Sequence, residues 1–199
     1  MRKNLIFFEI IIPTIFFMGF ASEFDVKIDP SVDFRKYKKV AVIEFEDAPE
    51  SPHSGEEVSN IVASELKKKG FEVLERKIVK ETLENLNIKK DEITESDLQK
   101  IQEALGVDAI VSGKVLMYQS KEAGGMDYYH RPADAKWAQF PTKNFFYNIS
   151  FELKMLDSKT GTILMEAKDH RQEISKLNKI QDMTKNIIKG MFKKLPKIK

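Results

Sequence analysis

The sequence predicts an α/β fold: a single domain in which a mixed β-sheet of about five strands, with a C-terminal antiparallel hairpin, is packed by about four helices. Three observations lead to this prediction. Apolar strand-like runs alternate with helical patterns in the first half of the chain, a strictly alternating strand and its return partner follow, and an amphipathic helix comes last. The length of 199 residues is typical of one domain.

The strongest strand signal is KVAVIEFE, from Lys39 to Glu46. Alternation directs two of its side chains to one face and three to the other: Val40 and Val42, against Ala41, Ile43 and Phe45. Apolar side chains on both faces predict a central strand that is covered on both sides.

Helical patterns and short strands follow this strand. A loop with two prolines separates it from a helix, Glu56–Lys69, which Gly70 ends. The strand FEVL comes next, and then two further helices. The apolar positions of the first are Ile78, Val79, Leu83 and Leu86, and the second is capped by Ser96 or Thr94 and ended by Gly106.

The second half of the chain predicts three strands and a helix. A strand over Ala109–Tyr118 is interrupted at Gly113, and Phe145–Leu156 alternates with one apolar and one polar face. The turn DSKTG leads to a return strand over Thr162–Lys168. The last helix carries its apolar side chains on one face: Leu177, Ile180, Met183, Ile187, Ile188 and Met191.

An insert at residues 119–144 shows no hydrophobic period, so we expect a long loop there with no regular element. Its candidate partner-binding residues are of the types that dominate protein–protein contacts or accompany them: Tyr128, Tyr129, His130, Arg131 and Trp137. The alternative is a structural lid, in which these rings fold back onto the domain.

The N-terminal residues 1–21 have the pattern of a signal peptide. Arg2 and Lys3 precede a mostly apolar stretch from Leu5 to Phe20, and small residues lead to a cleavage site after Ala21. The alternative is an uncleaved anchor, since Glu9 interrupts the stretch. We assign 22–36 to an N-terminal extension and 37–195 to the α/β domain.

The search for reactive groups finds no catalytic motif, metal site or cofactor site, and we expect a protein that is not an enzyme. There is no cysteine, no phosphate-binding glycine loop, and no ligand spacing among His53, His130 and His170. A net charge of +2 argues against nucleic acid. A metal- or nucleotide-dependent hydrolase stays open as an alternative, using the acidic strand end at Glu44, Glu46 and Asp47.

The end of the last helix is rich in lysine. The lysines are Lys185, Lys189, Lys193, Lys194, Lys197 and Lys199. Cations at a helix C-terminus complement the helix dipole, so an ordinary solvent-exposed helix end accounts for these lysines. Peripheral contact with an anionic lipid or envelope polymer is the alternative.

The order of four motifs resembles the CsgG-like cell-envelope family, which includes the curli secretion channel and lipoprotein activators of penicillin-binding proteins. The motifs lie in YKKVAVIEF, GFEVLER, LGVDAIVSGKVLMY and ISFELKMLDSKTGTIL, at Val40–Phe45, Phe71–Arg76, Gly106–Val115 and Phe151–Ile163. The resemblance spans about residues 37–192. Two departures stand out, because there is no cysteine to lipidate and the insert lacks the long alternating strands of a membrane pore.

The resemblance implies a mixed-sheet α/β domain that works in the Gram-negative cell envelope without catalysis. We expect a periplasmic or envelope-associated accessory protein that binds an envelope protein or self-associates. The alternative within this reading is a subunit of an oligomeric secretion or flagellar-associated assembly.

Overall fold

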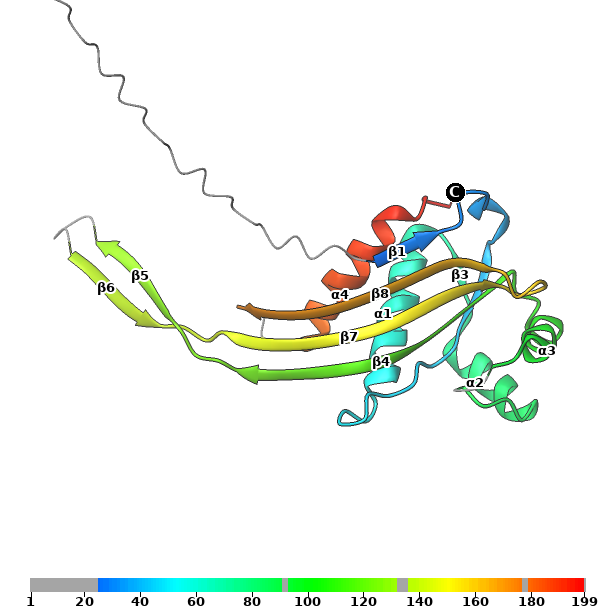
Figure 1. Ribbon diagram of the computed structural model, residues 1–199, viewed down its shortest axis with the longest axis horizontal. Helices are drawn as coiled ribbons and strands as arrows, with labels where there is room; N and C mark the ends of the chain where they lie inside the picture. Colours follow the sequence, from blue (N-terminus) through cyan, green and yellow to red (C-terminus); the bar gives the residue numbers. More distant parts are fainter. Residues whose placement is uncertain (1–24, 91–92, 132–135, 177–178, 199) are drawn as a thin grey trace, which may run out of the picture.

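The computed structural model describes residues 25–90, 93–131, 136–176 and 179–198; the side chains of residues 126–141 lie outside this description. Its centre is a six-stranded sheet in the order β1-β8-β7-β4-β2-β3 (Figure 1). The strands are β1 (Asp25–Ile28), β2 (Lys39–Val42), β3 (Glu72–Val73), β4 (Ala109–Glu122), β7 (Phe145–Asp157) and β8 (Ile163–Ser175).

The sheet is mixed, as predicted. Strand β2 runs parallel to β3 and β4, whereas β4, β7, β8 and β1 pair antiparallel in that order. The α/β class is therefore confirmed, with six strands in this sheet instead of about five. The additional strand is β1, which lies in the segment 22–36 and pairs Val26 with Ala167.

Helices cover the two faces of the sheet unequally. On one face, α1 (Ser54–Lys69) and α4 (Ile180–Met191) bury a large core that reaches from β2 to Tyr147 on β7. On the other face, α2 (Arg76–Asn85) and α3 (Glu95–Leu105) bury a smaller core over β2 and the adjoining ends of β4 and β7. Each apolar side chain buried in these cores stabilises the fold by about 1.5–3 kcal/mol.

Strand β2 is the central two-sided strand that the sequence predicts. Val40 and Val42 belong to the α1–α4 core, and Ala41 and Ile43 to the α2–α3 core. The expectation that Phe45 shares the face of Ile43 is wrong, because Phe45 lies in the α1–α4 core.

A bulge explains the change of face. Val42 is aligned with Val111, and Glu46 forms an isolated bridge with Lys114, so four steps on one chain match three on the other. One extra residue shifts the alternation by one position and turns Phe45 to the opposite side. Gly113 makes room for the ring, since a Cβ there would lie 2.7 Å from Phe45 Cε2.

The helix ends follow the sequence signals. Gly70 and Gly106 both adopt left-handed backbone conformations at the C-termini of α1 and α3. Of the two candidate caps for α3, Thr94 is the one used, and Asp97 completes a capping box with it. Among the described residues, no helix combines the length and apolar character that a bilayer crossing requires. The predicted signal peptide lies outside the described residues.

The expectation that residues 119–144 contain no regular element is wrong. Strands β4 and β7 stay paired as far as Glu122 and Phe145, and then β5 (Met126–Arg131) and β6 (Lys136–Pro141) form a separate two-stranded sheet. Figure 1 shows β5 and β6 at the far end of the long strands, away from the helices. The predicted return strand also continues to Ser175, seven positions beyond Lys168. Residues 119–144 show no apolar alternation, so hydrophobic periodicity does not detect these two strands.

Candidate partner-binding surface

Hydrogen bonds at Tyr118 connect strand β4 to helix α1, and Gln181 of α4 shares the acceptor. The Tyr118 hydroxyl donates to Glu57 Oε2 at 3.0 Å, and Gln181 Nε2 at the start of α4 donates to the same oxygen at 2.8 Å. Burial of the ring, together with the neighbouring Glu57 carboxylate, raises the pKa of Tyr118 above its ordinary value. The hydroxyl therefore stays protonated and remains a donor across the physiological pH range.

The loop before α1 also forms hydrogen bonds with β4 at Tyr118 and the next residue. Ser51 Oγ donates to the Tyr118 carbonyl at 2.7 Å, and Gln119 Nε2 donates to Glu50 Oε2 at 2.8 Å. Beyond this point β4 and β7 continue with none of the described helices on the face opposite α1 and α4 (Figure 1). That bare part of the sheet, together with β5 and β6, is the candidate surface.

The middle of this sheet face, between α3 and the level of Tyr118, is suited to water. Lys168 Nζ lies 3.5 Å from Glu152 Oε1, and Lys154 Nζ lies 3.9 Å from Glu166 Oε1. Exposed pairs of this kind contribute little to stability but keep a sheet face soluble. The middle of the face is therefore not a candidate for tight contact.

The distal end of the same face exposes apolar side chains. Register places Phe146 opposite Ile174, and their exposed fractions are 37% and 63%. We call these two residues the distal apolar patch. Two further exposed apolar residues lie closer to the middle of the face: Met117 on β4, which is opposite Ser150 and 38% exposed, and Leu116, the extra residue of a second bulge, which is 40% exposed. Neighbouring exposed apolar side chains are candidates for protein contact.

The distal apolar patch was missed by sequence reasoning, although one signal was present. Phe146 interrupts the polar series of the alternating strand, which otherwise runs through Asn148, Ser150, Glu152 and Lys154. The strand β8 was expected to end at Lys168, so Ile174 had no place in the predicted sheet.

Two glycines join the long strands to the tip. Gly124 has a φ of +65°, and a Cβ at this position would meet no heavy atom within 4 Å, so this glycine serves the turn of the backbone. At Gly125 a Cβ would meet Asn144 Nδ2 at 2.1 Å, and Asn144 Nδ2 donates to the Gly124 carbonyl at 3.2 Å. Backbone bonds from Ala123 to Asn144 and from Thr142 to Gly125 keep the two chains paired through this junction.

The five residues predicted for partner binding all lie in the β5–β6 hairpin. Tyr128, Tyr129, His130 and Arg131 follow one another on β5, and Trp137 lies on β6 directly opposite His130. The backbone thus brings these five positions together at one tip. Their side chains lie outside the described part of the structure, so their role stays a prediction.

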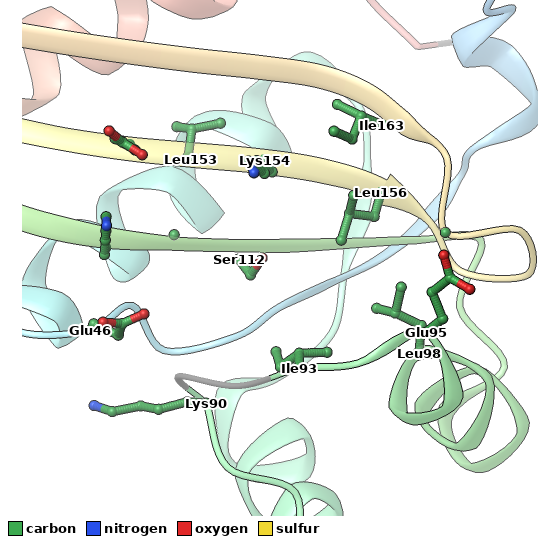
Figure 2. Close-up of a pocket in the computed structure, with 14 residues that line it drawn as sticks. Glu46, Lys90, Ile93, Glu95, Leu98, Ser112, Leu153, Lys154, Leu156 and Ile163 are labelled. Carbon is green, nitrogen blue, oxygen red and sulfur yellow. The ribbon is translucent and has the colours of Figure 1, made fainter.

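A groove of about 430 Å³ lies between the bare face and α3 (Figure 2). Its walls carry charges of both signs, with Glu46 and Lys90 at one end and Glu95 near Leu98 at the other. Leu156 and Ile163 supply apolar surface between them.

The acidic strand end of the hydrolase alternative does not form one site. Glu44 pairs with Arg76 and with Lys90 Nζ at 2.9 Å, and Asp47 Oδ1 accepts from the Gly55 amide at 2.7 Å at the start of α1. Of the three carboxylates, Glu46 alone lines the groove. Among the described residues, no three histidine, aspartate or glutamate side chains come close enough to hold a metal ion. The arrangement gives the hydrolase interpretation no support.

Comparison with known proteins identifies the family to which the chain is similar. Residues 25–189 match the family model of the curli production assembly/transport component CsgG. No curated protein sequence matches the chain.

Solved structures that share the fold include a PelC assembly and a neisserial lipoprotein. A PelC dodecamer from Paraburkholderia phytofirmans has a TM-score of 0.55 at 14% identity, covering 89% of this chain and 98% of that one. The lipoprotein GNA1162 from Neisseria meningitidis has a TM-score of 0.53 at 14% identity, covering 78% and 99%. The family match extends over most of the chain and over every strand of the six-stranded sheet, and the chain belongs to the CsgG family.

Proposed function

We propose that this protein is an exported, non-catalytic component of the cell envelope that self-associates through the distal apolar patch and the β5–β6 hairpin. The observation that carries the proposal is the contrast on one sheet face, where ion-paired charges in the middle give way to exposed apolar side chains beside the hairpin. Membership of the CsgG family and the dodecameric state of the PelC relative support assembly as its mode of action.

The geometry favours assembly with copies or with another envelope protein over chemistry. The groove carries balanced charges, and Glu44 and Asp47 are engaged in an ion pair and at a helix start. By contrast, Phe146 and Ile174 lose most of their remaining water contact only if another protein surface covers them.

The mass of the protein in solution tests self-association. Size-exclusion chromatography with light scattering on the purified chain should give a discrete mass above that of one 23.0 kDa chain. The double variant Phe146→Ser/Ile174→Ser should shift this mass toward the monomer. A single closed assembly would favour the ring-like secretion alternative, and a range of masses would not.

A matched control distinguishes the effect of the distal apolar patch from the effect of removing exposed apolar side chains elsewhere. Ile78 and Ile163 are each 45% exposed but lie outside the distal apolar patch. Ile78→Ser/Ile163→Ser should leave the assembly intact. If both double variants have the same mass as the parent, or if the parent is a monomer at all concentrations, self-association through this patch is wrong.

The candidate hairpin residues need their own variant. Tyr129→Ala/Trp137→Ala should keep the free energy of unfolding within about 1 kcal/mol and weaken assembly by about 2 kcal/mol or more if these rings are contact residues. A loss of several kcal/mol of folding stability, with normal assembly, would identify the hairpin as a structural lid.

Export is tested at the N-terminus. Mass spectrometry of the protein from fractionated cells should find Ser22 as the first residue, because Gly19 and Ala21 provide the small side chains that signal peptidase requires. An intact Met1 in a membrane fraction would favour the uncleaved anchor, and an intact Met1 in the cytosol would contradict export.

A further inference from the structure

Helices α1 and α4 run side by side in the same direction and end together. Gln181 Nε2 reaches Glu57 Oε2 at 2.8 Å near their first turns, and Lys69 Nζ reaches the Leu195 carbonyl at 2.8 Å past their last turns. The lysine-rich C-terminal ends of two helices therefore meet at one end of the molecule.

The segment after α4 is fixed in place there. The Ile198 amide donates to the Lys69 carbonyl at 2.7 Å, and Phe192, Leu195 and Ile198 are buried in the α1–α4 core. At Gly70 a Cβ would lie 2.0 Å from the Ile198 carbonyl oxygen, so glycine is needed for this close approach. The lysines of this segment are thus held on a folded surface and do not belong to a free tail.

Six lysines form the surface that we call the lysine face: Lys69, Lys185, Lys189, Lys193, Lys194 and Lys197. On α4 and just beyond it, Lys185, Lys189 and Lys193 follow at four-residue spacing, on the side opposite the buried Ile187 and Ile188. Except for the half-buried Lys69, all of them are exposed.

The lysines of this face gather without neighbouring carboxylates. Within the described part of the chain, none of its six Nζ atoms has a carboxylate within 4 Å, whereas eight lysines elsewhere do. Other lysines, such as Lys80, Lys89 and Lys159, also lack such a partner, but they lie on other surfaces. Lys69 and Lys194 donate instead to the backbone carbonyls of Leu195 and Val26. Burial and then the nearby Lys197 lower the pKa of Lys69, which places two like charges close together.

Stabilisation of the helix alone does not explain this arrangement. The dipole of a helix favours cations within its last turn, but Lys185 lies in the middle of α4. Like charges at a spacing of four residues destabilise a helix, and the one acidic residue of α4, Asp182, lies in its first turn. The chain as a whole is nearly balanced, with 33 basic and 31 acidic residues, so the excess is local.

We propose that the lysine face docks the protein on the surface of an anionic lipid bilayer. A bilayer suits an extended, outward-facing row of ammonium groups, each of which gains free energy near anionic headgroups. The described chain also begins beside this face, since Lys194 Nζ lies 3.4 Å from the carbonyl of Val26.

Vesicle binding of the full chain tests the proposal, which rests on the proposed envelope location. Co-sedimentation is measured with vesicles of phosphatidylcholine alone and of phosphatidylcholine mixed with phosphatidylglycerol. The parent should bind the anionic vesicles more tightly, and high salt should remove the difference. Lys185→Gln/Lys189→Gln/Lys193→Gln should weaken binding to the anionic vesicles at least about tenfold. A lysine in full contact with the surface contributes about fivefold in affinity, so this minimum allows for partial contact of the three.

The matched control is Lys80→Gln/Lys89→Gln/Lys159→Gln, which removes the same charge from exposed lysines on other surfaces. It should bind as the parent does, and a contribution from the apolar N-terminal segment is equal in all three proteins. Equal loss in both triple variants would show an effect of net charge alone and overturn the proposal, as would an unchanged affinity in the first. A monomeric protein that still shows the lipid difference would overturn self-association and leave this inference standing.

Discussion

Phenylalanines lie on both faces of β7, and Phe151 and Phe146 are in opposite environments. Phe151 points into the α1–α4 core and is fully buried, whereas Phe146 lies on the bare face and is 37% exposed. On β7 itself, the side chains toward α1 and α4 are apolar from Phe145 to Met155, while the bare face of the sheet changes from paired charges to the distal apolar patch. The comparison teaches that one face holds the fold together and that the distal part of the other is available for contact.

The largest expected effect is on the buried side of the comparison. Phe151→Ala should lower the free energy of unfolding by about 3–5 kcal/mol, because it leaves a cavity in a packed core. Phe146→Ala, in the same strand, should cost less than about 1 kcal/mol. Urea unfolding followed by circular dichroism measures both, and similar losses for the two variants would break the comparison.

Alanine substitutions at two glycines compare the packing of the core with that of the junction to the hairpin. Gly113→Ala places a methyl group 2.3 Å from the Glu152 carbonyl oxygen and against the Phe45 ring, and should destabilise the fold by about 1–3 kcal/mol. Gly124→Ala meets open space, and only its positive φ opposes the substitution, at about 1 kcal/mol. Thermal unfolding should rank the first variant below the second.

The α2–α3 side is held partly by charge, which predicts a pH dependence. Burial raises the pKa of Glu44, but the bonds from Lys90 and Arg76 outweigh it and the pKa is lowered below its ordinary 4.5. A carboxyl group whose pKa is lower in the folded state than in the unfolded state stabilises the fold at pH values above its unfolded-state pKa. This contribution is lost as the pH falls through the folded-state pKa.

Glu44→Gln should therefore cost about 1 kcal/mol at pH 7 and progressively less below pH 4.5. Urea unfolding of parent and variant over this range measures the difference. A loss that is independent of pH would show that packing, and not the ion pairs, accounts for the role of Glu44.

The smallest expected effect concerns the hairpin tip. Strands β5 and β6 pair only with each other among the described strands. Replacing residues 124–142 by an Asn-Gly turn should therefore change the free energy of unfolding by less than about 0.5 kcal/mol. The same replacement should reduce self-association. Substantial unfolding of the shortened chain would show that the tip supports the domain.

Sequence patterns predicted the covered parts of the molecule best. The two-sided burial of Val40, Ala41, Val42 and Ile43 follows from alternation, and the glycine ends of α1 and α3 follow from turn chemistry. In both cases the signal lies within a few neighbouring residues. The face of Phe45 was assigned wrongly because a bulge depends on pairing with β4, which lies far away in the sequence.

The candidate surface was harder to predict, for a physical reason. The insert has no hydrophobic period, so the hairpin of Tyr128 and Trp137 has the sequence pattern of a loop. The pairing of Phe146 with Ile174 depends on the continuation of β8 beyond Lys168, where local polarity suggests an end. Sequence composition located the insert but not the apolar patch at its base.

The attachment of Ile198 to Lys69 has a consequence for how the protein is made. Lys194 and Val26, which are in contact, lie 168 positions apart, and the large core is closed by Phe192, Leu195 and Ile198. Contacts between such distant parts of a chain slow folding, because most of the chain must be ordered before they form. A nascent polypeptide lacking these residues has an incomplete core. We expect it to remain unfolded during synthesis, the condition in which a translocon can thread it across a membrane.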